Sequence, residues 1–337
     1  MKIQKNYNLF KLNTFGIKVK AKFFAEVKSE NDLKKLFSLP EFRQNKKVFL
    51  GGGSNILFTK NLAGIVVLNK LKGIEILREN SKTVLIRSMG GEVWHNLVMF
   101  AVNSGYWGIE NLAFIPGTVG AAPMQNIGAY GVGLRDVLEN VEAYDVATGA
   151  KKVFSKKECE LGYRDSVFKN KLKNRYFISA ITLKLNKKKK KNVSYKALKE
   201  HLEKNKIEVK GPKDISDAVI SIRRSKLPDP KIIGNAGSFF KNVLVPLPKL
   251  GELLQAYPNL PYFEENGIAK IPAGWLIEQC GWKGYKAGNV GVHEKHALVL
   301  VNYGGATGKE IIGLANKIVT SVKEKFGLEL APEINIV

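Results

Sequence analysis

The chain has 337 residues, too many for one ordinary hydrophobic core, so we expect two or three domains. Hydrophobic residues make up 45% and charged residues 25%, which is typical of a soluble globular protein, and no run of about 18 apolar residues predicts a membrane span. The formal net charge of +24 would suit a nucleic-acid-binding protein. However, the basic residues are spread along the whole chain without the interleaved aromatic residues that stack on bases, so we expect no nucleic-acid partner.

The first 70 residues resemble a small α/β unit. Ser29 can cap a helix because Asp32 follows three residues later, and this predicted helix runs through Leu39. Strands are predicted at 23–27, 48–50 and 65–68.

A second unit follows, in which the longest segment, 115–133, fits neither a helix nor a strand. Five adjacent lysines, Lys187 to Lys191, predict a solvated surface loop because like charges repel. The predicted elements are strands at 84–87 and 176–185, a hairpin over 141–154, and helices at 92–103 and 196–206.

A third unit begins near the rigid connector Pro228-Asp229-Pro230. A helix is predicted at 275–280 and a strand at 296–302. The last helix is well marked, since Thr307 and Glu310 form a capping box and Gly327 can end it. We therefore expect a helix from about 307 to 326.

Cysteine and histidine usage argues against disulfides and metals. Cys159 and Cys280 are too few for a disulfide framework or a thiolate cage, which favours a reducing cytoplasm. His293 and His296 are three residues apart but have no evident third ligand, so we expect no metal. Residues 1–15 mix Lys and Asn with apolar residues, which argues against a secretory signal.

Two Gly-rich loops are candidate ligand sites. Gly51 to Asn55 follows a strand, and successive glycines let backbone N–H groups converge on an anion; a plain turn explains this loop equally well. The loop lacks the sixth-position Gly of a Rossmann fingerprint. Residues 115–131 form a second, longer loop rich in small apolar residues. Two such loops together suggest a large cofactor with a diphosphate.

Ser238 lies between Gly237 and two aromatic residues, a setting that can expose a hydroxyl in an apolar wall. No G-x-S-x-G elbow surrounds it, which argues against a hydrolase nucleophile. On the residues alone, a serine in a tight turn is the favoured interpretation.

Taken together, these segments resemble the UDP-N-acetylenolpyruvoylglucosamine reductase family, also called UDP-N-acetylmuramate dehydrogenases. The resemblance covers nearly the whole chain, in the branch of the family with a tyrosine-bearing substrate loop. The matching motifs are LNTFG at 12–16, GGGSN at 51–55, IPGTVGAAPMQNIGAYG at 115–131, YRDSVFK at 163–169, KLPDP at 226–230, GNAGSFFKN at 234–242, AGWLIEQCGWKG at 273–284, HALVLVN at 296–302 and Pro332-Glu333.

The resemblance implies a three-domain α+β fold. Two subdomains would form an FAD-binding vanillyl-alcohol-oxidase-like (PCMH-type) flavin fold, and an α/β domain would bind the substrate. The expected boundaries are 1–70, with 329–337 returning to it, then 71–225, and 226–328 for the substrate domain.

The resemblance also implies a reaction in peptidoglycan precursor synthesis. NADPH would reduce FAD and leave, and the enolpyruvyl methylene carbon of UDP-N-acetylenolpyruvoylglucosamine would then take a hydride from the flavin. We expect a cytoplasmic monomer without membrane or nucleic-acid partners.

Family roles transfer to individual positions of this chain. Arg164 resembles the arginine that binds the enolpyruvyl carboxylate, Glu333 the carboxylate that acts with it, and Ser238 the general acid. Asn335 stands where some relatives have an arginine, so that arginine's contact is not expected here. The implied cofactor contacts are Gly51, Gly52, Gly53, Ser54, Asn55, Pro116, Gly117, Thr118, Gly120, Asn126, Gly128, Ala129 and Tyr130, and the implied substrate contacts are Tyr195, Lys226 and Asn242.

These residue types suit the chemistry on independent grounds. Hydride addition to an enol ether conjugated with a carboxylate builds negative charge, which a guanidinium stabilises. The resulting carbanion needs a proton, which a positioned hydroxyl can supply. Two alternatives stay open: another flavin oxidoreductase of the same fold acting on an alcohol or sugar, and a basic nucleic-acid-binding protein.

Overall fold

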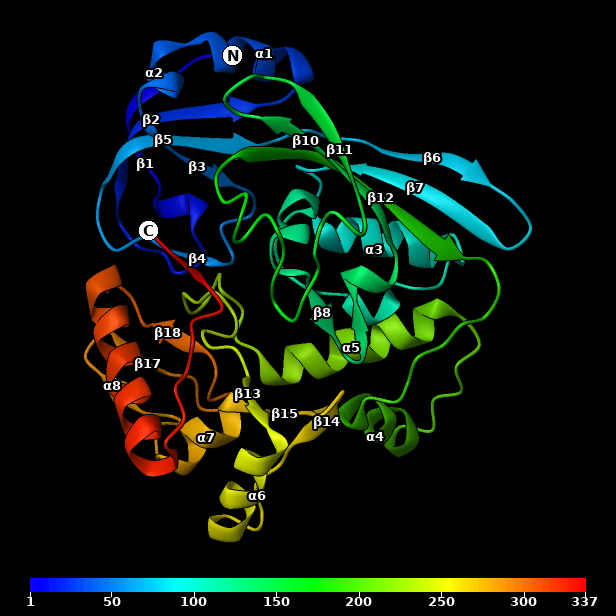
Figure 1. Cartoon of the computed structure of the whole chain (residues 1–337), viewed down its shortest axis with the longest axis vertical. Coiled ribbons are helices and arrows are strands. Elements are labelled where there is room, and N and C mark those ends of the chain that lie inside the picture. Colours follow the sequence, from blue (N-terminus) through cyan, green and yellow to red (C-terminus); the bar gives the residue numbers. More distant parts are fainter. The chain divides into compact units, whose positions relative to one another are not determined.

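The structure, a computed structural model, describes residues 1–337 and divides into two units (Figure 1). Unit 1 comprises 1–7, 20–52 and 62–225, and unit 2 comprises 8–19, 53–61 and 226–337. Helices and strands are mixed in both, which agrees with the predicted α+β class. No helix combines the length and the apolar character that crossing a bilayer requires.

The first sheet of unit 1 has the strand order β1-β2-β5-β3, in which β5 pairs in parallel with both β2 and β3. Parallel neighbours need a crossover, and two helices supply it between β2 and β3. The Ser29–Asp32 capping box is present and starts the first of these helices, as predicted. The elements are β1 (Gln4–Asn8), β2 (Lys20–Val27), α1 (Glu30–Ser38), α2 (Pro40–Arg43), β3 (Lys46–Leu50) and β5 (Leu62–Asn69).

The second sheet of unit 1 is antiparallel, with the order β11-β10-β12-β7-β6. Figure 1 shows α3 next to this sheet and α5 below α3, farther from the strands. Trp94 and Leu97 of α3, and Ile215 and Val219 of α5, share one buried apolar cluster with the sheet residue Ile181. The elements are β6 (Ile74–Glu79), β7 (Thr83–Met89), α3 (Trp94–Asn103), β10 (Leu138–Asp145), β11 (Lys151–Ser155), β12 (Tyr176–Asn186), α4 (Lys196–Lys204) and α5 (Pro212–Lys226).

The passage 115–133 contains no continuous helix or strand, as predicted. It consists of short turns and one two-residue hairpin, so its path depends on contacts with neighbouring elements. Around it the structure has the 3-10 turns η2 (Glu110–Leu112), η3 (Val119–Ala121), η4 (Pro123–Gln125) and η5 (Leu134–Asp136), and the strands β8 (Gly128–Ala129) and β9 (Val132–Gly133).

Unit 2 holds two three-stranded sheets, β13-β15-β14 and β16-β17-β18, and a parallel pair of β4 with the C-terminal β19. The capping box of Thr307 and Glu310 starts α8, and Gly327, at φ +64°, ends it, as predicted. The elements are η1 (Phe10–Leu12), β4 (Ile56–Leu57), β13 (Val243–Pro246), α6 (Leu247–Ala256), β14 (Phe263–Glu265), β15 (Ile268–Ile271), α7 (Ala273–Gln279), β16 (Lys286–Ala287), β17 (Val290–Val292), β18 (Leu300–Asn302), α8 (Gly308–Phe326) and β19 (Asn335–Ile336).

One sequence-based expectation was wrong in part. The predicted strand 296–302 is a strand only at Leu300–Asn302, because the His293 and Val299 backbones close a turn before it. The five lysines 187–191 are all exposed, as predicted, and two of them have partners: Lys187 forms an ion pair with Glu79 at 2.5 Å, and Lys189 donates to the Val209 carbonyl at 2.6 Å. The loop is therefore anchored at two points.

Candidate active site

The two Gly-rich loops meet within unit 1. A Cβ on Gly51 would lie 2.2 Å from Thr118 Oγ1, and one on Gly52 would lie 2.9 Å from the Gly117 Cα, so only glycine lets the two backbones approach this closely. The Thr118 hydroxyl is buried and has no hydrogen-bond partner among the protein atoms. The structure thus forms a shared cradle from segments more than sixty residues apart in the chain, with a buried polar atom facing into it.

The start of α3 supports this cradle. The Trp94 N–H donates to the Gly117 carbonyl at 3.1 Å, and the Val119 N–H donates to Glu92 at 2.9 Å. Val93 and Thr118 form the β-bridge between these two bonds. The loop therefore runs antiparallel to the residues that begin the helix, which fixes its backbone without a regular sheet.

The continuation of the loop is held by side-chain bonds. Asn126, at φ +44°, donates to the Gly162 carbonyl at 2.8 Å and accepts from the Arg135 N–H at 3.0 Å. Both ends of its amide thus bond backbone groups, which means that Asn126 shapes the loop through its side chain. The Asn111 amide donates to the Tyr130 carbonyl at 2.8 Å and fixes the far end.

Arg164 lies against this loop. Its guanidinium donates to the Gly128 carbonyl at 2.7 Å, and its backbone is in the left-handed region at φ +51°. A non-glycine residue there costs on the order of 1–3 kcal/mol, and such strain clusters at functional sites. The neighbouring Ser166 hydroxyl donates to the Met124 carbonyl at 2.7 Å, so YRDS is bonded to the same loop through both Arg164 and Ser166.

A cationic and aromatic cluster surrounds Tyr130. Its ring packs edge to face on Tyr195 at 5.4 Å, and its hydroxyl lies close to the positive charge of Arg223 of α5. Burial raises the pKa of Tyr130 above its ordinary value, against the opposing effect of Arg223. Burial, followed by the nearby charge of Arg164, lowers the pKa of Arg223. Two guanidinium groups thus lie close enough to act on each other, an arrangement that favours an anionic ligand.

Ser238 and Glu333 lie on neighbouring segments of unit 2. Ser238 bridges to Val299, and the Glu333 N–H donates to the carbonyl of Phe239, the residue after Ser238, at 2.8 Å. Gly237, at φ +71°, precedes Ser238, and a Cβ there would meet no atom within 4 Å. The side chains of Ser238 and Glu333 are only partly buried, so a ligand can reach them.

The N-terminal LNTFG motif positions this serine loop. The Asn235 N–H donates to the Thr14 carbonyl at 3.0 Å, and the Asn302 amide donates to the Phe15 carbonyl at 2.8 Å. A Cβ on Gly234 would lie 2.4 Å from the Phe15 oxygen, so the two segments are in close backbone contact. Three motifs distant in the sequence therefore form one structural core beneath Ser238.

The remaining predicted residues lie as follows. Gly53, at φ +65°, Ser54 and Asn55 belong to unit 2, where a Cβ on Gly53 would lie 2.0 Å from the Leu12 oxygen. Asn242 accepts from the Ala273 N–H, the first residue of α7, at 3.1 Å. Lys226 is exposed at the end of α5.

Comparisons with known proteins identify the family. Residues 229–337 match the family model described as UDP-N-acetylenolpyruvoylglucosamine reductase, C-terminal domain, and residues 21–154 match that of an FAD binding domain. The reductase of that name from Amoebophilus asiaticus is 49% identical over the full length of both chains, and that from Flavobacterium johnsoniae is 44% identical, also over both full lengths. The chain belongs to the UDP-N-acetylenolpyruvoylglucosamine reductase family. It is accordingly an FAD-dependent oxidoreductase.

The fold agrees with that of a solved member of the family. The reductase from Thermus caldophilus superposes with a TM-score of 0.68, covering 100% of this chain and 99% of that one, at 22% identity. At this identity the likeness establishes the fold alone, and it confirms the predicted fold class.

The residues present fit the flavin cofactor of the family. The cradle of Gly51, Gly52 and Gly117 leaves no room for side chains, and the Thr118 hydroxyl offers an unused polar group there. Closely spaced glycine backbones with a free polar atom beside them suit a diphosphate, which backbone N–H groups can bind. No group of three or more His, Cys, Asp or Glu side chains is placed to bind a metal ion.

Sequence reasoning missed two residues at this site. Arg223, on α5, contacts Tyr130, and His95, on α3, contacts the residue that precedes the second Gly-rich loop. The only available signal was amphipathic spacing in 212–226, which places Ile215, Val219 and Ile222 on one face and would have predicted α5.

Proposed function

We propose that this chain reduces UDP-N-acetylenolpyruvoylglucosamine to UDP-N-acetylmuramate during peptidoglycan precursor synthesis, with NADPH as the reductant. The observation that carries the proposal is the cradle in which Gly51 and Gly52 meet Gly117 and Thr118, in a chain 49% identical over its full length to a reductase of that name. The cradle supports the assignment of the flavin site, and membership of the family supports the assignment of the substrate.

Arg164, Ser238 and Glu333 carry the chemistry in this proposal. Bound FAD supplies the hydride. The Arg164 guanidinium binds the substrate carboxylate and stabilises the negative charge that develops on it, and Glu333 has the role of the carboxylate in the family's Pro-Glu motif. The Ser238 hydroxyl donates a proton to the carbon that does not receive the hydride. The strained backbone of Arg164 supports this assignment, because the surrounding bonds fix its side chain before substrate arrives.

The remaining predicted contacts complete the proposal. Tyr195, Lys226 and Asn242 bind the UDP portion, and Tyr195 is already packed on Tyr130 of the loop. FAD is contacted by the Gly-rich cradle and by further residues of the two loops, namely Gly53, Ser54, Asn55, Pro116, Gly120 and Ala129. Asn126 acts through the loop that its side chain shapes.

We also propose the three-domain division at 1–70 with 329–337, 71–225 and 226–328, and a cytoplasmic, monomeric enzyme. The two cysteines are free, which suits a reducing compartment. Light scattering of the purified chain tests the monomer, and a dimer at micromolar concentration contradicts it.

The visible spectrum and turnover test the function together. We expect absorption at about 450 nm and release of FAD, not FMN, on denaturation. NADPH should bleach this band, and the enolpyruvyl substrate should restore it without oxygen. A protein that takes up no FAD contradicts the proposal. A flavoprotein that is reoxidised only by oxygen after oxidising an alcohol or sugar supports the alternative oxidase of the same fold instead.

A further inference from the structure

Phe114, the residue before the second Gly-rich loop, has a strained backbone. Its φ is +59°, in the left-handed region that bulky residues avoid. Such a conformation persists only when surrounding groups determine it. The peptide groups on both sides of Phe114 are in fact bonded, and by side chains from two different helices.

His95 of α3 and Arg223 of α5 make these bonds. The Phe114 N–H donates to His95 Nδ1 at 3.1 Å, and Arg223 Nε donates to the Phe114 carbonyl at 3.1 Å. The His95 ring also packs edge to face on the Phe114 ring at 5.8 Å, and the Arg224 guanidinium lies 5.3 Å from that ring's centroid. We call His95, Phe114 and Arg223 the Phe114 clamp.

His95 is suited to its part in the clamp. Its Nδ1 can accept only if it carries no proton, so the ring must be neutral. Burial, followed by the positive charge of Arg224, lowers the pKa of His95 below its ordinary value. The neutral, accepting form is therefore maintained at neutral pH.

Arg223 also connects the two ends of the loop. Its Nε donates to the Phe114 carbonyl before the loop, and its guanidinium lies close enough to the Tyr130 hydroxyl, near the end of the loop, to lower the pKa of that hydroxyl. Between these points the first part of the loop is bonded to the start of α3, through Trp94, and to the Gly90 carbonyl, which accepts from the Gly120 N–H at 2.8 Å. Loss of the clamp would free the entry to the loop while leaving the two sheets intact.

We propose that His95 and Arg223 are positioning residues for the flavin: by fixing the strained Phe114 backbone, they hold residues 115–120 in the conformation that accepts FAD. Neither residue is assigned a contact with the cofactor. The proposal rests on the placement of FAD on this loop in the proposed function.

The test is FAD binding to the flavin-stripped full chain, followed by quenching of flavin fluorescence. His95→Leu removes the acceptor at similar volume, whereas His95→Asn keeps an acceptor where Nδ1 lies. Arg223→Met and Arg223→Lys form the corresponding pair. We expect the Kd for FAD to rise about 10–100-fold in the Leu and Met variants, and His95→Asn to recover to within about 3-fold of wild type.

Stability is measured in parallel by urea unfolding of the stripped protein. His201→Leu and Arg175→Met, on other elements of unit 1, are matched controls and should leave the Kd unchanged. Folded Leu and Met variants with wild-type Kd overturn the clamp, as does His95→Asn behaving like His95→Leu. If His95→Leu does not fold, the test rests on His95→Asn and Arg223→Lys. A wild-type Kd for FAD in His95→Asn together with weaker binding in Arg223→Lys supports the clamp. An equal loss of binding in both variants overturns it. A wild-type chain that binds no FAD overturns the proposed function as well.

Discussion

At the scale of single residues, Ser238 offers the most selective test of the mechanism. In Ser238→Ala, NADPH should reduce the flavin at close to the normal rate, because that step needs no proton from the serine. Reoxidation by the enolpyruvyl substrate should slow by roughly 10²–10⁴-fold, the usual contribution of a positioned proton donor. Stopped-flow absorbance measures each half-reaction separately.

Two further outcomes make this test decisive. Ser238→Cys should recover part of the rate because a thiol can also donate a proton, and substrate affinity should change little. The alternative from the sequence, a serine that only shapes a turn after Gly237, predicts a modest stability loss and similar effects on both half-reactions. Slowing of both steps together would assign Ser238 to the turn.

The sequence located the loops of the site but not what positions them. A Gly-rich loop can be recognised locally, because the residue types themselves permit close backbone approach. The Phe114 clamp has no such signature, since His95 is 19 residues and Arg223 109 residues from Phe114 in the chain. Asn126 illustrates the same limit: it lies in a recognisable motif, but the sequence does not show that its side chain bonds the backbones of Gly162 and Arg135.

At the scale of elements, an ion-pair cluster joins three strands of the antiparallel sheet. Glu142 of β10 bonds Arg87 of β7 and pairs with Lys151 of β11 at 2.8 Å. The bond to Arg87 is the main cause that lowers the pKa of Glu142 to about 2, against the opposing effect of burial. A carboxylate whose pKa is lowered on folding stabilises the folded state fully at pH values above its ordinary pKa of 4.5. This stabilisation is lost as the pH falls from 4.5 towards 2.

Glu142→Gln should therefore lower the free energy of unfolding at pH 7 by about 1–3 kcal/mol, between the values for exposed and buried pairs. The difference from wild type should shrink as the pH falls from 4.5 towards 2. Urea unfolding at several pH values measures it. Glu200→Gln is the control, because its pair with Lys196 spans 3.8 Å on an exposed helix face. A difference that does not vary with pH would mean that packing, not charge, accounts for the loss.

Elements were predictable where local signals were strong. The capping boxes of α1 and α8 involve residues three apart, so both helix starts were correctly predicted. The strands of the β13-β15-β14 sheet have only three or four residues, too few for an alternating pattern to be recognised. For α5, stability comes from packing its apolar face on the sheet cluster, which no local pattern fully encodes.

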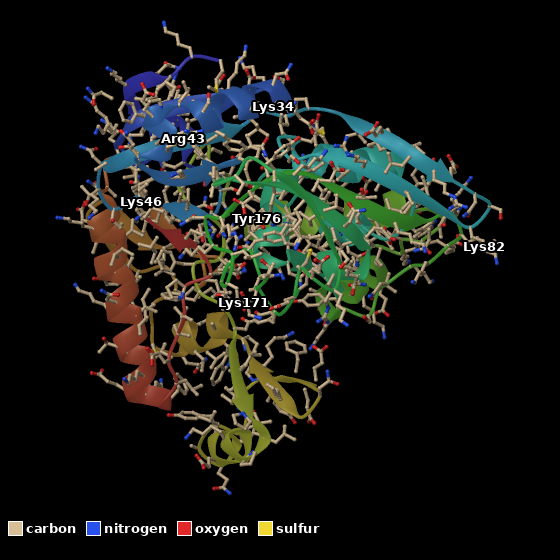
Figure 2. All side chains as sticks on the ribbon, turned by 45° about the horizontal axis from the view of Figure 1, so that its top comes forward. Lys34, Arg43, Lys46, Lys82, Lys171 and Tyr176 are labelled. Atoms are coloured by element: carbon tan, nitrogen blue, oxygen red, sulfur yellow. The ribbon has the colours of Figure 1, made fainter.

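At the scale of the whole molecule, the net charge of +24 affects binding without belonging to any one site. Figure 2 labels five of these cations at separate places in unit 1: Lys34 on α1, Arg43 on α2, Lys46 on β3, Lys82 in the turn between β6 and β7, and Lys171 in the turns before β12. All five are exposed, so their charges remain hydrated. Charges distributed in this way produce a diffuse positive field around the molecule, which attracts anions over distances of about a Debye length.

This field should be visible in the salt dependence of catalysis. The proposed substrate carries a diphosphate and a carboxylate, so screening should weaken its attraction. Between 0.1 and 1 M NaCl the Debye length falls from about 10 to about 3 Å. We expect KM for the enolpyruvyl substrate to rise by roughly 3–10-fold, while kcat changes by less than about 2-fold because the chemistry occurs within the site. Sucrose at equal osmolarity is the control and should leave KM unchanged.

A KM that is independent of salt would show that contacts at Lys226, Tyr195 and Asn242 alone determine binding. The basic surface would then need a different explanation, such as the nucleic-acid partner that its sign permits, and that partner should be detected as salt-sensitive RNA binding.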